Sequence, residues 1–156
     1  MQDIANQIHK SLLKKIKTVS VAESCTGGLL CASLTGLSGS SGYFVLGIIA
    51  YSNQAKHKLL GIPLTLINAE GAVSYEVALK MAESVRKLAK TDYGISITGI
   101  AGPKGGTAQK PVGTVYIAAS NKKKTICQKF LFKGSRASIR KQSVAKALDL
   151  FREFLE

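Results

Sequence analysis

Hydrophobic positions recur with helical spacing in several segments of the chain. In residues 74–90, apolar side chains stand three or four positions apart, and Ser74 occupies the place where a helix N-cap is expected. Elsewhere, glycines and changes of pattern end the helical segments. On these criteria we predict further helices at residues 1–17, 25–37 (ending near Gly36), 52–61 and about 135–155.

Short apolar runs rich in β-branched and aromatic residues predict the strands. These runs are residues 18–24, 41–52, 93–100, 113–120 and 125–132. A lysine-rich turn joins the last two and predicts an antiparallel hairpin. Because strands and helices alternate along the rest of the chain, we expect a single-domain α/β sandwich over residues 1–156, with a mixed, mostly parallel sheet.

Three polar segments directly follow predicted strands. They are "AESCTGG" at residues 22–28, "AYSN" at 50–53 and "SITGIAG" at 96–102. The carboxyl ends of parallel strands meet at one edge of a sheet, and ligands bind beyond that edge. We therefore expect the functional site there.

Composition narrows the class of protein. A chain of 156 residues suits one domain, and no apolar run approaches the roughly 18 residues of a membrane span. The amphipathic N-terminus contains Asp3 and has no signal-peptide pattern, so we interpret it as a first helix. Three cysteines without a CxxC pair indicate free thiols in a reducing compartment. These features predict a cytoplasmic protein with no membrane contact.

The net charge of +13 comes mainly from lysines, which supply 18 of the 22 cationic side chains and are scattered along the sequence. Nucleic-acid binders usually gather cations on one face and interleave stacking aromatics. Aromatic residues make up only 6% here, and tryptophan is absent. The pattern favours a solvated surface over a nucleic-acid groove. A positive field would still attract a phosphorylated small molecule.

Ser24 stands at a predicted strand-to-helix turn, followed by Thr26, Gly27 and Gly28. Unpaired N–H groups at a helix start can hold a phosphate, a carboxylate or an oxyanion, and glycines let a ligand approach the backbone. Serine at such a position is also a frequent N-cap. The local pattern alone favours the cap over a nucleophile.

A nucleophile would need a base, and the sequence has only two histidines, His9 and His57, both in predicted helices. We therefore expect neither a cysteine–histidine nor a serine–histidine pair, and interpret Cys25 as a small buried residue. Lys56 is the remaining candidate base. It would need its pKa lowered by about three units, or roughly 4 kcal/mol of environment. A solvated surface lysine is the alternative.

A glycine-rich loop over residues 99–113 begins at Gly99, directly after Thr98. Such loops inside compact domains usually contact ligands. Arg136 and Arg140 are four residues apart, hence on one helix face, where they could grip a phosphate or carboxylate or be solvated. No His, Cys, Asp or Glu residues have metal-ligand spacing. We predict neither a metal nor another cofactor.

Seven motifs follow one another along the chain: "AESCTGG", "GSSGYF", "YSNQAK", "GAVS", "TGIAGPKGG", "KPVGTV" and "GSRASIR". In this order they resemble the CinA C-terminal domain family, which includes stand-alone nicotinamide-nucleotide amidases. The resemblance extends from about Val19 to Ala147. It implies a three-layer α/β/α fold, a dimer, and hydrolysis of the carboxamide of nicotinamide mononucleotide to nicotinic acid mononucleotide and ammonia.

The resemblance also implies roles for individual residues. Ser24 would be the nucleophile and Lys56 its base, with Tyr51 orienting the pair, so that the nucleophile now outranks the cap. Backbone N–H groups near Gly27 or Gly99 would stabilise the oxyanion. The other implied site residues are Thr98, which would line the site, and the anion-binding arginines Arg136 and Arg140.

Two departures from the family pattern stand out. Lys104 occupies a position in the glycine loop where many members have an acidic residue, and full-length members carry a large N-terminal domain that we do not expect here.

Two alternatives to the amidase also stay open. One is a non-catalytic ligand- or DNA-associated protein of competence or damage responses that keeps the pocket, and the other is an amidase for a different phosphorylated carboxamide.

Overall fold

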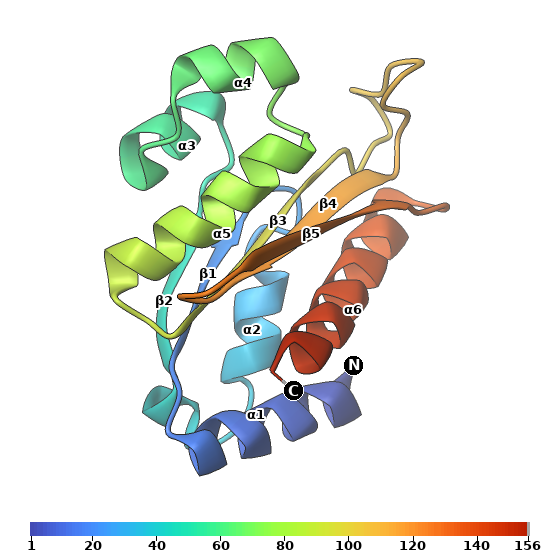
Figure 1. The fold of residues 1–156 in the computed structure, drawn as a ribbon. Coiled ribbons are helices and arrows are strands. Elements are labelled where there is room, and N and C mark those ends of the chain that lie inside the picture. Colours follow the sequence, from blue (N-terminus) through green and yellow to red (C-terminus); the bar gives the residue numbers. More distant parts are fainter. Residues whose placement is uncertain (156) are drawn as a thin grey trace.

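The computed structural model describes residues 1–155 and contains one five-stranded sheet with helices on both faces (Figure 1). The strands are β1 (Val19–Glu23), β2 (Phe44–Ile49), β3 (Tyr93–Gly99), β4 (Thr114–Ser120) and β5 (Thr125–Leu131). The helices are α1 (Gln2–Lys15), α2 (Leu29–Thr35), α3 (Asn53–Leu60), α4 (Leu64–Glu70), α5 (Tyr75–Ala89) and α6 (Arg136–Phe154), with a short 3-10 helix η1 (Ser40–Gly42).

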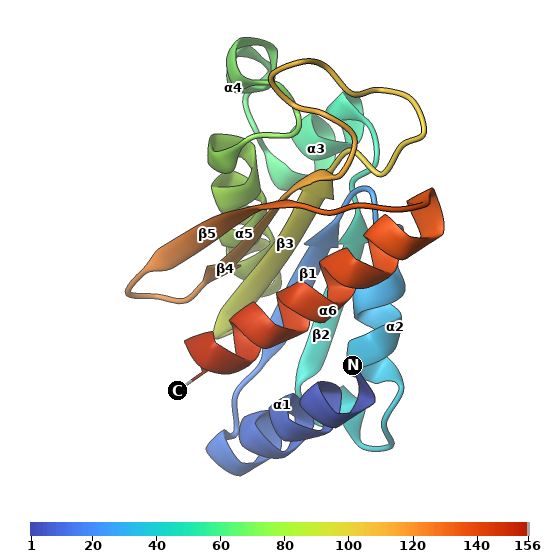
Figure 2. The same cartoon turned by 90° about the vertical axis from the view of Figure 1, so that its right-hand side faces the viewer.

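The strands are arranged in the order β2-β1-β3-β4-β5. β1 pairs in parallel with both β2 and β3, whereas β4 pairs antiparallel with β3 and β5. Helices α1, α2 and α6 cover one face, and α5 covers the other, with α3 and α4 beyond its N-terminal end (Figures 1 and 2). The predicted three-layer α/β/α sandwich with a mixed sheet and a 113–132 hairpin is confirmed.

Among residues 1–155, buried apolar side chains form three clusters, one on one face of the sheet and two on the other. The largest includes Leu12 of α1, Phe151 of α6 and Val21 of β1. On the opposite face, the second includes Met81 of α5 and Ala22, the next residue of β1, and the third joins α5 to β4. Successive strand side chains point to opposite faces, so a central strand must be apolar on both. β1 is accordingly buried along its whole length.

The predicted helix at 25–37 was wrong at its start, because α2 begins only at Leu29 and residues 25–28 form a turn. Gly27 and Gly28 both have positive φ angles, of 59° and 99°. This left-handed region is open to glycine at little cost but interrupts a right-handed helix. The glycines therefore delay the helix and leave the residues after β1 in an irregular loop.

Two further differences concern short elements. The predicted strand at 41–52 is reduced to β2, since residues 40–42 form η1 and the chain leaves the sheet after Ile49. α4 was missed, because its seven residues are too few for a repeating apolar pattern and follow Pro63. Within residues 1–155, no helix has both the length and the apolar character needed to cross a membrane.

The strand order places a change of direction between β1 and β3. From β1 the chain passes through α2 on one face to β2, and it returns through α5 on the other face to β3. In open α/β sheets, a ligand crevice forms beyond the carboxyl ends of the strands at such a point. The segments 24–28 and 99–113 both begin at this crevice.

Candidate active site

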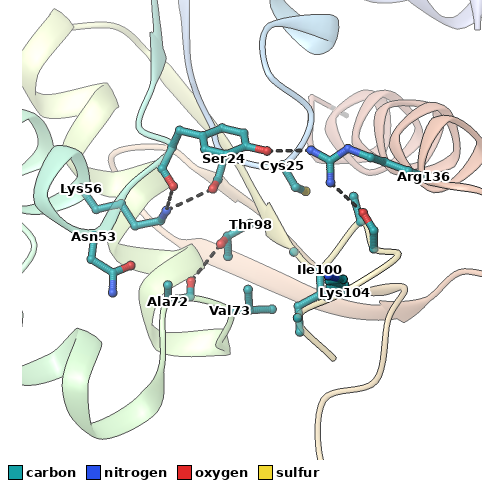
Figure 3. A pocket seen from close by; sticks show the side chains of 15 residues that line it. Ser24, Cys25, Asn53, Lys56, Ala72, Val73, Thr98, Ile100, Lys104 and Arg136 are labelled. Atoms are coloured by element: carbon teal, nitrogen blue, oxygen red, sulfur yellow. Dashed lines mark hydrogen bonds between the residues drawn. The ribbon is translucent and has the colours of Figure 1, made fainter. Parts of the chain in front are cut away.

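A cavity of about 270 Å³ lies at the carboxyl ends of β1 and β3 (Figure 3). Its walls come from five parts of the chain: the turn after β1, the start of α3, the segment before α5, the glycine loop and the first residue of α6. The predicted location of the site at this edge agrees with the cavity. The predicted site residues that line it are Ser24, Tyr51, Lys56, Thr98, Gly99 and Arg136.

Lys56 and Ser24 are in direct contact at the base of this cavity. Lys56 Nζ lies 3.0 Å from Ser24 Oγ, 2.9 Å from the carbonyl oxygen of Ala50 and 3.3 Å from that of Tyr51. The Lys56 side chain belongs to α3 but is only 1% exposed. Among residues 1–155, no carboxylate forms a salt bridge with it. The alternative of a solvated surface lysine is therefore wrong.

Burial lowers the pKa of Lys56 from its ordinary value, because the charged ammonium loses solvation. Both protonation states of the amine fit the three neighbours of Nζ, and the ammonium form can donate to all three. The two carbonyl oxygens can only accept hydrogen bonds, so a neutral amine gives them its two N–H groups and turns its lone pair toward Ser24 Oγ. This arrangement can accept a proton from the serine hydroxyl.

Glu23, and not Ser24, caps the start of α2. The Glu23 carboxylate is fully buried and accepts hydrogen bonds from the N–H groups of Gly28 (3.1 Å), Leu30 (3.2 Å) and Cys31 (2.8 Å). The interpretation of Ser24 as an N-cap is therefore wrong. Because the glycines delay the helix, the hydroxyl of Ser24 is left beside Lys56. The sequence alone indicated no function for Glu23.

The N–H groups at the start of α2 are accordingly occupied by protein. In addition, the N–H of Gly27 donates to the carbonyl of Ser24 at 3.1 Å. Thr26, Gly27 and Gly28 do not line the cavity. A direct substrate contact by these three residues stays a prediction, and the contacts in the structure give them a different task, which is to shape the turn after β1.

Tyr51 and Arg136 meet at the rim. Arg136 donates to the Tyr51 hydroxyl at 2.7 Å and to the carbonyl of Gly102 at 2.8 Å, so it ties the start of α6 to the glycine loop. The Tyr51 side chain is 55% exposed. Tyr51 reaches Lys56 through its backbone carbonyl, whereas its ring reaches Arg136.

Arg140 is not among the residues that line the cavity, even though it lies one turn after Arg136. Its guanidinium donates to the carbonyl of Thr26 at 2.8 Å and lies close to Gly27. The shared helix face predicted for the two arginines thus serves two tasks. Arg136 contacts the cavity rim, and Arg140 holds the turn that carries Ser24. A direct anion contact by Arg140 stays a prediction.

Short segments that stand out in the sequence only as motifs form the remaining walls. The hydroxyl of Thr98, at the end of β3, donates to the carbonyl of Ala72 at 2.8 Å and so brings the "GAVS" segment to the cavity. Asn53 and Val73 also line it but were missed as site residues. Both fall inside motifs that resemble the family, which was the available signal.

Cys25 lines the cavity next to Ser24 and is buried. Desolvation raises the pKa of its thiol to about 11, so the thiol is protonated at neutral pH. Neither histidine lines the cavity, since His9 contacts the Tyr43 hydroxyl and His57 contacts the carbonyl of Ile62. Cys25 therefore lacks the base that a cysteine nucleophile requires.

The charge of the cavity wall has one sign. Lys56, Lys104 and Arg136 are its ionisable cations, and no Asp or Glu is among the lining residues. Such a wall favours an anionic or phosphorylated ligand. Among the described residues, His, Cys, Asp and Glu side chains form no group of three or more that could hold a metal ion.

Comparison with known proteins identifies the family to which the chain is similar. A family profile described as the CinA C-terminal domain matches residues 1–155. The CinA-like protein of Endomicrobium trichonymphae is 51% identical over 152 residues, which are 97% of this chain and 36% of that protein. The CinA-like protein of Desulfotalea psychrophila is 48% identical over 155 residues, or 99% of this chain and 38% of that protein. The chain thus spans little more than a third of these relatives.

Solved structures with the same fold match nearly the full length of this chain. The competence/damage inducible protein CihA from Agrobacterium tumefaciens superposes with a TM-score of 0.97 at 34% identity, over 99% of this chain and 95% of that one. The competence damage-inducible protein A (ComA) from Klebsiella pneumoniae gives a TM-score of 0.95 at 28% identity, over 99% and 96%. The chain belongs to the CinA C-terminal domain family.

Proposed function

We propose that this chain is an amidohydrolase that converts nicotinamide mononucleotide to nicotinic acid mononucleotide and ammonia. The observation that carries the proposal is the contact between the buried Lys56 amine and the Ser24 hydroxyl inside a cavity. A purely binding pocket has no need to bury a lysine amine against a serine at a cost in solvation. The choice of amide rests on the resemblance to the amidases of the family.

In the first step, neutral Lys56 removes the proton of Ser24, and Ser24 Oγ attacks the amide carbon. Only the neutral form can act as the base, and burial of the amine increases its fraction at a given pH. The carbonyls of Ala50 and Tyr51 fix the amine, and they also solvate the ammonium that forms. The nucleophile is thus activated without a histidine.

The attack turns the amide oxygen into an oxyanion that needs hydrogen-bond donors. Within residues 1–155, the N–H of Cys25 donates to no other part of the chain. The residue after a serine nucleophile commonly supplies one donor of an oxyanion hole. We assign the Cys25 N–H to this task, in place of the Gly27 N–H that the Ser24 carbonyl already occupies.

Collapse of the tetrahedral intermediate breaks the carbon–nitrogen bond. Lys56 returns its proton to the departing nitrogen, which leaves as ammonia, and the substrate stays bound to Ser24 as an ester. Water, deprotonated by the same amine, then hydrolyses the ester and regenerates the Ser24 hydroxyl. The positive pyridinium ring of the substrate makes the carbonyl carbon more electrophilic at both attacks.

The anionic end of the nucleotide requires cations at the other end of the cavity. Arg136 lies at the rim and presents a guanidinium that already contacts Tyr51 and Gly102. The planar set of N–H donors on a guanidinium suits a phosphate.

A dimer and a cytoplasmic location complete the proposal, as the family resemblance and the free cysteines suggest.

The test is ammonia release from nicotinamide mononucleotide, with nicotinic acid mononucleotide identified as the second product. Wild type is compared with Ser24→Ala and Lys56→Met, with Cys25→Ala as the matched control from the same cavity. We expect losses of at least about 100-fold in the first two variants and little change in the third. If folded wild-type protein releases no ammonia, the amidase proposal fails and the binding-protein alternative replaces it.

A further inference from the structure

Lys104 is the cavity cation that the proposed reaction does not use. Lys56 is engaged by Ser24 and two carbonyls, and Arg136 by Tyr51 and Gly102. Among residues 1–155, Lys104 makes no hydrogen bond through its amine and no salt bridge, although it lines the same cavity. Its charge is therefore available to a ligand.

The loop that carries Lys104 is held on both sides of this residue. On one side, the Gly102 carbonyl accepts from Arg136 at 2.8 Å. On the other, Lys110 donates to the carbonyl of Glu70 at the end of α4, at 2.5 Å. The position of Lys104 at the rim thus follows from contacts with two helices, and not only from the flexibility of a glycine-rich segment.

Packing inside the loop limits its shape further. A Cβ added to Gly102 would lie 2.5 Å from Val112, and one added to Gly106 would lie 2.7 Å from the backbone of the same residue. Gly102 and Gly105 also have positive φ angles, of 76° and 92°. The two ends of the loop are therefore in close contact, and Lys104 lies in the bend between them, beside the cavity.

The two rim cations have complementary chemistry. In Figure 3, Lys56 lies at one end of the cavity, and Arg136 and Lys104 lie toward the other. Arg136 offers a planar fork whose orientation is fixed by two protein acceptors, whereas a lysine offers a mobile point charge. A phosphate monoester carries nearly two negative charges at neutral pH, so a single guanidinium neutralises only part of it.

We propose that Lys104 is a specificity-determining residue that binds the phosphate of the substrate together with Arg136. It makes this chain select a phosphorylated pyridine nucleotide over the corresponding nucleoside. The inference deepens the proposed function, because it concerns the same cavity and depends on that assignment for the identity of the amide.

The kinetic test compares nicotinamide mononucleotide with nicotinamide riboside, which has the same amide and lacks the phosphate. We expect Lys104→Gln to lower kcat/KM for the nucleotide about 10-fold, mainly through KM, and to leave the riboside unchanged. Lys104→Arg should retain most of the preference, and Lys104→Asp should weaken it beyond Lys104→Gln. Lys123→Gln, in the turn between β4 and β5, is the control for net charge. It should leave kcat/KM unchanged for both substrates.

Equal losses on both substrates would show that Lys104 only supports the loop, and no loss on either would show a solvated lysine. Both results overturn the inference and leave the amidase assignment intact. Calorimetric binding of ribose 5-phosphate provides a readout that needs no turnover. We expect Lys104→Gln to weaken this binding about 10-fold. Absent binding to the wild-type protein, or equal affinity of the two proteins, overturns the inference even if the chain releases no ammonia.

Discussion

Replacing Glu23 by alanine removes the acceptor for three backbone N–H groups at once. In the wild-type protein, the buried carboxylate accepts from Gly28, Leu30 and Cys31 at distances of 2.8 to 3.2 Å. A buried donor left without a partner costs about 1–3 kcal/mol. Since Gly28 and Cys31 are only partly buried, water can compensate in part. We expect the free energy of unfolding to fall by about 3–5 kcal/mol.

Urea unfolding followed by circular dichroism measures this loss, and Ser33→Ala is the matched control. Ser33 also lies in α2, but its hydroxyl donates to the Leu29 carbonyl, an interaction that stabilises a helix little. We expect this control to change the free energy of unfolding by less than about 1 kcal/mol. A loss for Glu23→Ala below that of the control would refute the assignment of Glu23 as the residue that fixes the turn after β1.

Two other predictions concern the same turn. Arg140→Met should lower kcat more than it raises KM, because Arg140 contacts the Thr26 carbonyl and not the cavity; a higher KM with unchanged kcat would instead make Arg140 a substrate ligand. The pKa of Cys25, raised to about 11 from an ordinary 9.0, leaves about 100-fold less thiolate. Iodoacetamide at pH 7.5 should therefore modify Cys25 at least 100-fold more slowly in folded than in unfolded protein. Mass spectrometry measures the two rates, and equal rates would show that the Cys25 thiol is not buried.

The strands and the edge of the sheet that carries the cavity could be predicted because both follow from local pattern and topology. Apolar runs ended at polar segments, and parallel strands bring their carboxyl ends together. The pairing of Ser24 with Lys56 could not be predicted in this way. The two residues are 32 positions apart, and their contact depends on β1 and β2 being neighbours in the sheet. The resemblance to the family supplied that pairing.

The role of Glu23 was not predictable from the residues around it. Serine just before a predicted helix start is a frequent N-cap, so the local pattern pointed to Ser24 and not to Glu23. Two glycines in the left-handed region postpone the helix to Leu29, and this displacement brings Glu23 to its N-terminus. Backbone conformation thus decided which of two adjacent side chains became the cap and which was left for Lys56.

The two arginines show a related limit of spacing rules. Positions i and i+4 on a helix do share a face, but the ends of two long side chains can contact different segments. Arg136 is in the first turn of α6 and reaches the glycine loop, whereas Arg140 reaches the turn after β1. The packing of α6 against the sheet determined this division, and the sequence contains no local sign of it.

The most direct test of the central claim, that a neutral buried lysine activates Ser24, is the pH dependence of kcat/KM for nicotinamide mononucleotide. Only unprotonated Lys56 is active, so the rate should rise with pH and level off above the pKa of this group. Burial lowers that pKa, and the midpoint should therefore fall below the ordinary lysine value of about 10.4. Lys56→Arg, which stays protonated, should be inactive throughout. A rate that is independent of pH in this range, or an active Lys56→Arg enzyme, would contradict the account.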